Sequence, residues 1–262
     1  TSVKDYSVSA WIPGVGFSYN TAPTFNLFWG IHRGFAPAGP GAKEATRPES
    51  SINYELGGRY KNSGLAIQAT GFYSDYVNIL GRATLATTGD DSGEEYNGGK
   101  ARIAGVELSL DYDLAWQRGL SARVPLRIAY TATHAQFRSA FDSKYDPWGD
   151  VQVGYRLPYL PPHQMSGSIG YERNRFNITF STIALGAMRT KAGKGRILAG
   201  EGVDAYMIFN LDLGLNLNNK GTIFAGIQNL SDKRYNVARR PAGMRPGLPR
   251  TVVVGYRISG VR

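Results

Sequence analysis

The chain has 262 residues, a formal net charge of +10 and no cysteine. Without cysteine it has no disulfides, no thiolate metal site and no thioredoxin-like chemistry. No apolar run approaches the roughly 18 residues of a membrane-spanning helix. The cations cluster in predicted loops rather than on one helix, which argues against nucleic acid as a partner. An anionic small ligand or lipopolysaccharide phosphate fits this charge better, and a merely solvated rim is the plain alternative.

Alternating apolar and polar residues predict eleven strands along the chain. The predicted strands cover 12–20, 25–36, 49–61, 64–80, 101–114, 121–138, 162–172, 175–190, 205–218, 221–231 and 250–259. The alternation is clearest in 205–218, where Met207, Phe209 and Leu211 oppose Ile208, Asn210 and Asp212. This strand is too long for an average soluble strand and about the length of one tilted across a bilayer.

The connections between the predicted strands alternate between short and long. The short ones are 20–24, 61–64, 115–121, 172–175 and 219–221, and the long ones are 37–48, 81–100, 139–161, 191–204 and 232–249. Outer-membrane barrels have short periplasmic turns and long extracellular loops, whereas a soluble sandwich has no reason to sort its loops by end. The sequence therefore predicts an all-β fold, an antiparallel transmembrane β-barrel.

The strand count bears on how much of a barrel this chain forms. Bacterial single-chain barrels have an even number of strands, and lipid does not tolerate an open sheet edge. Eleven strands are half of the roughly 22 strands of plugged outer-membrane transporters. We therefore expect this chain to form half of a 22-stranded plugged barrel.

Several segments carry motifs that resemble those of TonB-dependent outer-membrane receptors, particularly the ferric-siderophore and ferric-citrate branch. The motifs follow one another in the order of that family. They are IPGVGFSYN at 12–20, FNLFWGIHRGFA at 25–36, PESSINYELGGRY at 48–60, GFYSDYVNIL at 71–80, NGGKARIAGVEL at 97–108, QNLSDKRY at 228–235 and PGLPRTVVVGY at 246–256.

The resemblance implies that residues 1–262 are the C-terminal portion of the receptor barrel domain, with the plug domain and the N-terminal strands absent. The chain also ends at Val261 and Arg262, where the family usually ends on an aromatic residue. The implied function is active transport of a ferric chelate, a siderophore or ferric citrate, across the outer membrane of a Gram-negative bacterium. The implied partners are the chelate, TonB through the missing N-terminal region, lipopolysaccharide and outer-membrane lipid, and the barrel-assembly machinery. Neither a cofactor nor an enzymatic activity is implied.

Basic residues in the long loops are the candidates for binding an anionic chelate, because arginine forks match carboxylate oxygens. His32 and Arg33 lie near the predicted extracellular end of their strand. The remaining candidates are Arg189, Lys191, Arg196, Arg239, Arg240 and Arg245. The alternative for these loop cations is lipopolysaccharide contact or ion pairs between loops.

Charged residues inside the predicted strands are expected to face the lumen, where they either contact the plug through ion pairs or are hydrated. They are Glu55, Arg59, Glu107, Asp111, Asp113 and Asp212.

Two other functions stay open at the level of sequence. One is a self-contained small outer-membrane pore or autotransporter translocator. The other is an outer-membrane hydrolase, for which His163 and Ser166 are the nearest pair. The sequence has no G-x-S-x-G elbow, which disfavours the hydrolase.

Overall fold

The computed structural model describes residues 9–39, 46–83, 92–217, 221–240 and 243–258. Eleven antiparallel strands form one sheet, in which each strand pairs with its neighbours in chain order. They are β1 (Gly14–Ala22), β2 (Phe25–Ala36), β3 (Glu49–Asn62), β4 (Leu65–Val77), β7 (Ala101–Asp113), β8 (Pro125–Phe137), β11 (His163–Arg173), β12 (Phe176–Leu185), β15 (Tyr206–Asn216), β16 (Thr222–Gln228) and β19 (Thr251–Arg257). All eleven predicted strands are confirmed, and the antiparallel all-β class with them.

The largest differences from the predicted boundaries, of three residues or more, fall at four strand ends. One of them is the end of the strand predicted over 221–231, which lies at Gln228. The strand predicted over 64–80 ends at Val77, because Asn78 has a φ of 55° and leaves the extended conformation. The strand predicted over 175–190 ends at Leu185, and the one predicted over 121–138 begins only at Pro125. Residue 218 and the predicted turn residues 219 and 220 lie outside the described residues, as does residue 259 at the end of the last predicted strand.

The register gives the sheet one apolar and one polar face. One row across the strands runs through Leu108, Tyr130, Met165, Ala184 and Met207. A neighbouring row on the other face runs through Thr70, Glu107, Thr131 and Gln164. Successive side chains of a strand point to opposite faces, so the alternation in the sequence becomes two chemically distinct surfaces.

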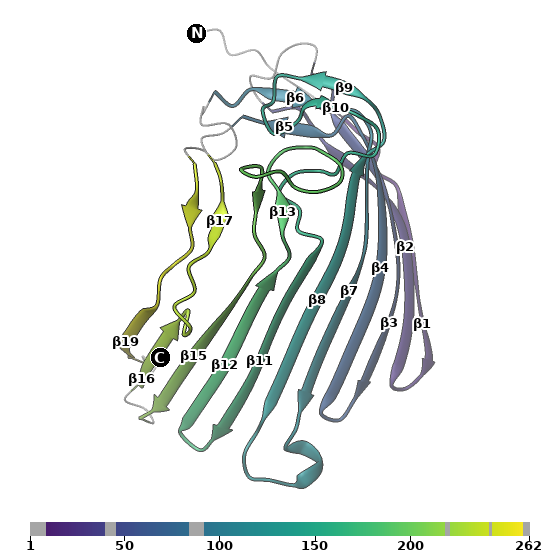
Figure 1. Cartoon of the computed structure of the whole chain (residues 1–262). Coiled ribbons are helices and arrows are strands. Elements are labelled where there is room, and N and C mark those ends of the chain that lie inside the picture. Colours follow the sequence, from purple (N-terminus) through teal and green to yellow (C-terminus); the bar gives the residue numbers. More distant parts are fainter. Residues whose placement is uncertain (1–8, 40–45, 84–91, 218–220, 241–242, 259–262) are drawn as a thin grey trace.

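Long loops gather at one end of the sheet and short turns at the other (Figure 1). Four long connections carry hairpins too short for the sequence pattern to reveal. They are β5 (Leu80–Arg82) with β6 (Glu95–Asn97), β9 (Phe141–Ser143) with β10 (Gly149–Val151), β13 (Met188–Arg189) with β14 (Gly202–Val203), and β17 (Asn236–Ala238) with β18 (Arg245–Pro246). At the turn end, Trp116–Arg118 forms a short 3-10 helix.

Aromatic side chains on the polar face lie over glycines of the neighbouring strand. Phe28 is directly opposite Gly57, Phe72 opposite Gly105, and Phe224 opposite Gly255. In each pair a Cβ on the glycine would lie 2.3 to 2.6 Å from the ring tip. The glycines therefore leave room for rings that would otherwise clash with the neighbouring strand.

The sheet is open within the described residues, because β1 and β19 each pair with one strand only. The main cluster of buried apolar side chains lies in and beside the loops, not between layers of the sheet. Among the described residues, no helix is both long and apolar enough to cross a bilayer.

Candidate functional site at the loop end of the sheet

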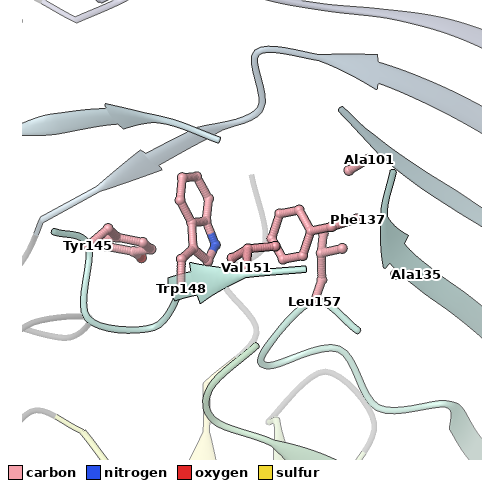
Figure 2. Close-up of a cluster of buried hydrophobic side chains, with 7 residues drawn as sticks. All are labelled: Ala101, Ala135, Phe137, Tyr145, Trp148, Val151 and Leu157. Carbon is pink, nitrogen blue, oxygen red and sulfur yellow. The ribbon is translucent and has the colours of Figure 1, made fainter. Parts of the chain in front are cut away.

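An aromatic cluster holds the loop end together (Figure 2). Trp148 lies edge-on to Phe137, Phe141 and Tyr145, with ring centroids 5.9, 5.7 and 4.9 Å away. The β5–β6 hairpin packs on the same tryptophan, because a Cβ on Gly81 would lie 2.9 Å from its ring. Edge-to-face aromatic pairs add about 0.5–1.5 kcal/mol each beyond burial, so these loops form an ordered layer.

A single carboxylate joins three of the loops. Asp146 lies in the connection between β9 and β10, and Lys191 approaches it with Nζ 3.4 Å from Oδ1. The Arg240 guanidinium contacts the other oxygen, Oδ2, and its side chain is largely buried. Lys191 and Arg240, both predicted as ligand contacts, therefore pair with one acid. This agrees with the alternative considered for the loop cations, in which they form ion pairs between loops.

Two further predicted cations hold the β13–β14 hairpin. Arg189 is buried, and its guanidinium donates to the carbonyl of Gly195 at 2.7 Å. Arg239 donates through Nε to the carbonyl of Gly202. Burial lowers the pKa of the Arg189 guanidinium from its ordinary value and the nearby Arg156 lowers it further, while Glu201 acts in the opposite direction.

Arg196 and Arg245 have exposed side chains in the same loop layer. Among the described residues, no carboxylate lies within ion-pair distance of either guanidinium. Of the six cations predicted in these loops, these two are therefore the exposed ones that pair with no carboxylate among the described residues.

His32 and Arg33 are separated by the pleat of β2. His32 lies on the polar face, where it helps line a concavity of about 560 Å³ along β2, β3 and β4. Arg59, with its guanidinium 4.3 Å from the centre of the Phe28 ring, lines the same concavity. Arg33 lies on the apolar face and donates to the carbonyl of Trp11 at 3.4 Å. The structure therefore does not bring His32 and Arg33 together.

The six charged residues expected in the lumen all lie on the polar face by register. Asp111 pairs with Arg127 at 3.1 Å, and near the turns Arg123 contacts both Asp113 and Glu172. Glu55 and Glu107 have no cation within ion-pair distance among the described residues. Glu49, which lines the same concavity, also has no cation within ion-pair distance among the described residues and accepts instead from the backbone N–H of Leu80 at 2.8 Å. This face thus offers three carboxylates beside the concavity that no described cation pairs with.

The residues considered for hydrolysis do not form a catalytic pair. His163 lies on the apolar face, where its Nδ1 is 2.8 Å from the Tyr130 hydroxyl, while Ser166 lies on the polar face. The strand itself separates nucleophile from base, so proton transfer between them is blocked. Within the described ranges, no group of three or more histidine or acidic side chains is arranged to hold a metal ion.

Asp146, the contact that joins the loops, is not among the residues predicted from the sequence. Its partners come from connections far along the chain, and nothing in the local pattern around Asp146 marks them. The one signal in the sequence is the excess of cations in the later loops, some of which can pair with acids in other loops.

Comparison with known proteins identifies the architecture. The family model described as TonB dependent receptor-like, beta-barrel, matches residues 1–230. The pesticin receptor of Yersinia enterocolitica is 25% identical over 233 residues, which are 83% of this chain and 30% of that protein.

Solved structures of two receptors share the fold. The ferric citrate transporter FecA, in its unliganded form, superposes with a TM-score of 0.71 at 19% identity over 92% of this chain and 37% of its own. The ferric-catecholate import receptor Fiu from E. coli K12 gives a TM-score of 0.68 at 20% identity over 92% of this chain and 34% of its own.

This chain spans about a third of the length of these relatives. The strand order, the segregation of long loops to one end and the family match over most of the residues agree with one another. The chain therefore belongs to the TonB-dependent receptor-like β-barrel family.

Proposed function

We propose that this chain is the C-terminal portion of the barrel of a receptor that imports a ferric chelate across the outer membrane of a Gram-negative bacterium. The plug and the remaining strands would come from the rest of the protein, and TonB would supply the energy through that region. The observation that carries the proposal is an amphipathic antiparallel sheet with its cationic loops at one end, in a chain of this receptor family.

The charge of the loops and the ligands of the relatives support a ferric chelate as the ligand class. FecA is a ferric citrate transporter and Fiu is a ferric-catecholate import receptor. Arg196 and Arg245 are exposed arginines in the loop layer, and arginine forks suit the carboxylate or catecholate oxygens of such ligands. His32 adds a polar contact deeper in the concavity.

The unpaired edges favour the receptor over a self-contained small pore. Within the part of the chain that the structure describes, β1 and β19 each leave a row of backbone groups without a partner in the sheet. Hydrocarbon penalises such groups by several kcal/mol each. We also propose that the protein acts without catalysis, with lipopolysaccharide around the barrel and with the barrel-assembly machinery inserting it.

The test measures binding of ferric citrate and of ferric siderophores to the full-length receptor in detergent. Quenching of tryptophan fluorescence reports the binding. We expect Arg196→Ser with Arg245→Ser to weaken binding of the anionic chelate about tenfold, because two charge-assisted contacts are lost. Arg118→Ser is the matched control, since Arg118 is exposed at the opposite end of the sheet.

Three results would count against the proposal. The first is a wild-type receptor that binds no ferric chelate of either class. The second is an iron-free chelator that competes as well as the ferric form. The third is a loss in the Arg118 variant equal to that in the double variant.

A further inference from the structure

Charge is nearly absent from the apolar face of the sheet. Apart from histidines, the strands of the main sheet place four charged side chains on this face: Arg33, Asp75, Arg102 and Arg173. Arg173 lies at the turn end, in the last pair of the β11–β12 hairpin. The other three lie together at the loop end.

These three residues share one row of the register. Arg33 is opposite Ile52, Ile52 is opposite Asp75, and Asp75 is opposite Arg102. The row continues from Arg102 to Gln136, and an isolated bridge extends it to Arg156. With neighbouring strands about 4.8 Å apart, the row is roughly 24 Å long.

Arg138 joins the row from just above it, with its guanidinium 2.9 Å from Asp75. We call Arg33, Arg102, Arg138 and Arg156 the cationic row. Asp75 is the one carboxylate that shares the register row with these arginines, and it forms an ion pair with Arg138. The row therefore carries a formal excess of three positive charges.

Neutral groups hold the rest of the cationic row in place. With the Gln136 amide oriented to satisfy its neighbours, its oxygen accepts from Arg102 at 2.7 and 3.0 Å. Among the described residues, no carboxylate lies within ion-pair distance of Arg33, Arg102 or Arg156. Since neutral partners leave the charge uncompensated, the site is complementary to an anion.

An apolar band begins directly below the cationic row. Tyr54 and Tyr73 occupy the next row, with ring centroids 6.1 Å apart, and Leu56, Val106 and Ala132 lie on the row after it. Aromatic girdles mark the membrane interface of outer-membrane barrels. The cationic row thus lies at the level where hydrocarbon gives way to the headgroups of the outer leaflet.

We propose that the cationic row binds the phosphate groups of lipopolysaccharide, with its acyl chains against the apolar band below. The inference rests on the proposed outer-membrane placement, and it assigns lipid contact to the outer face of β2–β8 rather than to the loop cations. Guanidinium forks bind phosphate oxygens bidentately, and the surrounding low-dielectric lipid strengthens the interaction.

The experiment compares the full-length receptor with the variant Arg33→Gln and Arg102→Gln, purified in detergent. Mass spectrometry measures the lipopolysaccharide retained per protein, and rebinding uses lipopolysaccharide micelles and phosphatidylglycerol vesicles. Each arginine near an anionic headgroup contributes about a fivefold factor in affinity, so the double variant should bind lipopolysaccharide more than tenfold more weakly. The matched control is Arg173→Gln, the apolar-face arginine at the turn end, which should retain the wild-type amount.

Several outcomes would overturn the proposal. They are equal retention in the double variant and the wild type, an equal loss in Arg173→Gln, equal binding of phosphatidylglycerol vesicles, and a dimer that the double substitution dissociates. Heat-modifiable mobility in electrophoresis shows that each variant is folded. Chelate binding is measured in parallel, because a receptor that retains lipopolysaccharide but binds no ferric chelate contradicts the proposed function alone.

Discussion

At the scale of single residues, Asn229 connects the end of β16 to the last loop. It is 1% exposed, and its amide nitrogen donates to the carbonyls of Lys233 and Leu248, each at 2.9 Å. Its amide oxygen accepts from the backbone N–H of Lys233 at 2.8 Å. Asn229 also has a φ of 50°, a conformation that asparagine tolerates better than most residues.

Replacing Asn229 with leucine keeps the approximate volume and removes all three side-chain hydrogen bonds. We expect the free energy of unfolding to fall by about 2–4 kcal/mol, because the change leaves buried backbone groups without partners. Urea unfolding of the full-length protein in detergent measures this. Asn236→Leu is the control, since the Asn236 amide makes one weak contact, to the Met244 sulfur. Equal losses in both variants would contradict this role for Asn229.

At the scale of strands, the polar face depends on pairing rings with glycines. At Gly105 a Cβ would lie 2.2 Å from the carbonyl oxygen of Ala132 and 2.6 Å from the Phe72 ring. Gly71, on the opposite face, would meet nothing closer than the Leu56 carbonyl at 3.8 Å. Gly105 is therefore required by its neighbours, whereas Gly71 is not.

Gly105→Val should destabilise the sheet by about 1–3 kcal/mol, because strand β8 or the Phe72 ring must move to admit the side chain. The readout is the temperature at which the full-length protein loses its heat-modifiable mobility in electrophoresis. Gly71→Val introduces the same side chain where space is available and should leave this temperature nearly unchanged. A similar fall in both variants would mean that valine itself, and not crowding at Gly105, is responsible.

The eleven long strands were predictable because period-two alternation extends over many residues, as in 205–218. The loop hairpins were not, because strands of two or three residues such as Met188–Arg189 contain no period. The sequence shows that the long loops are rich in cations, but it does not show which acid each cation contacts, because those contacts form only in the folded protein. Lys191 and Arg240 meet Asp146 only once three separate connections have been brought together.

At the scale of the whole molecule, the sheet formed by the described residues has two unpaired edges. β1 and β19 lie at opposite ends of the strand order and pair on one side only. In lipid, every backbone hydrogen-bonding group on those edges requires a partner. The partners would be further strands of the same receptor.

Residues 1–262 produced alone should therefore fail to form a compact monomer in detergent, whereas the full-length receptor should give one. Heat-modifiable mobility in electrophoresis and the mass of the protein–detergent particle distinguish the two. A heat-modifiable monomer of 28.6 kDa from residues 1–262 would contradict the expectation and favour a self-contained pore.

The contacts of Asp146 have a consequence for how such receptors diverge. Its carboxylate contacts Lys191 from one loop and Arg240 from another, so the charges of these three segments depend on one another. Replacing the segment that holds Asp146 with the corresponding loop of another receptor would leave both Lys191 and Arg240 without this carboxylate. An exchange of loops by recombination, or by deliberate grafting, therefore keeps both ion pairs only if it carries all three segments together.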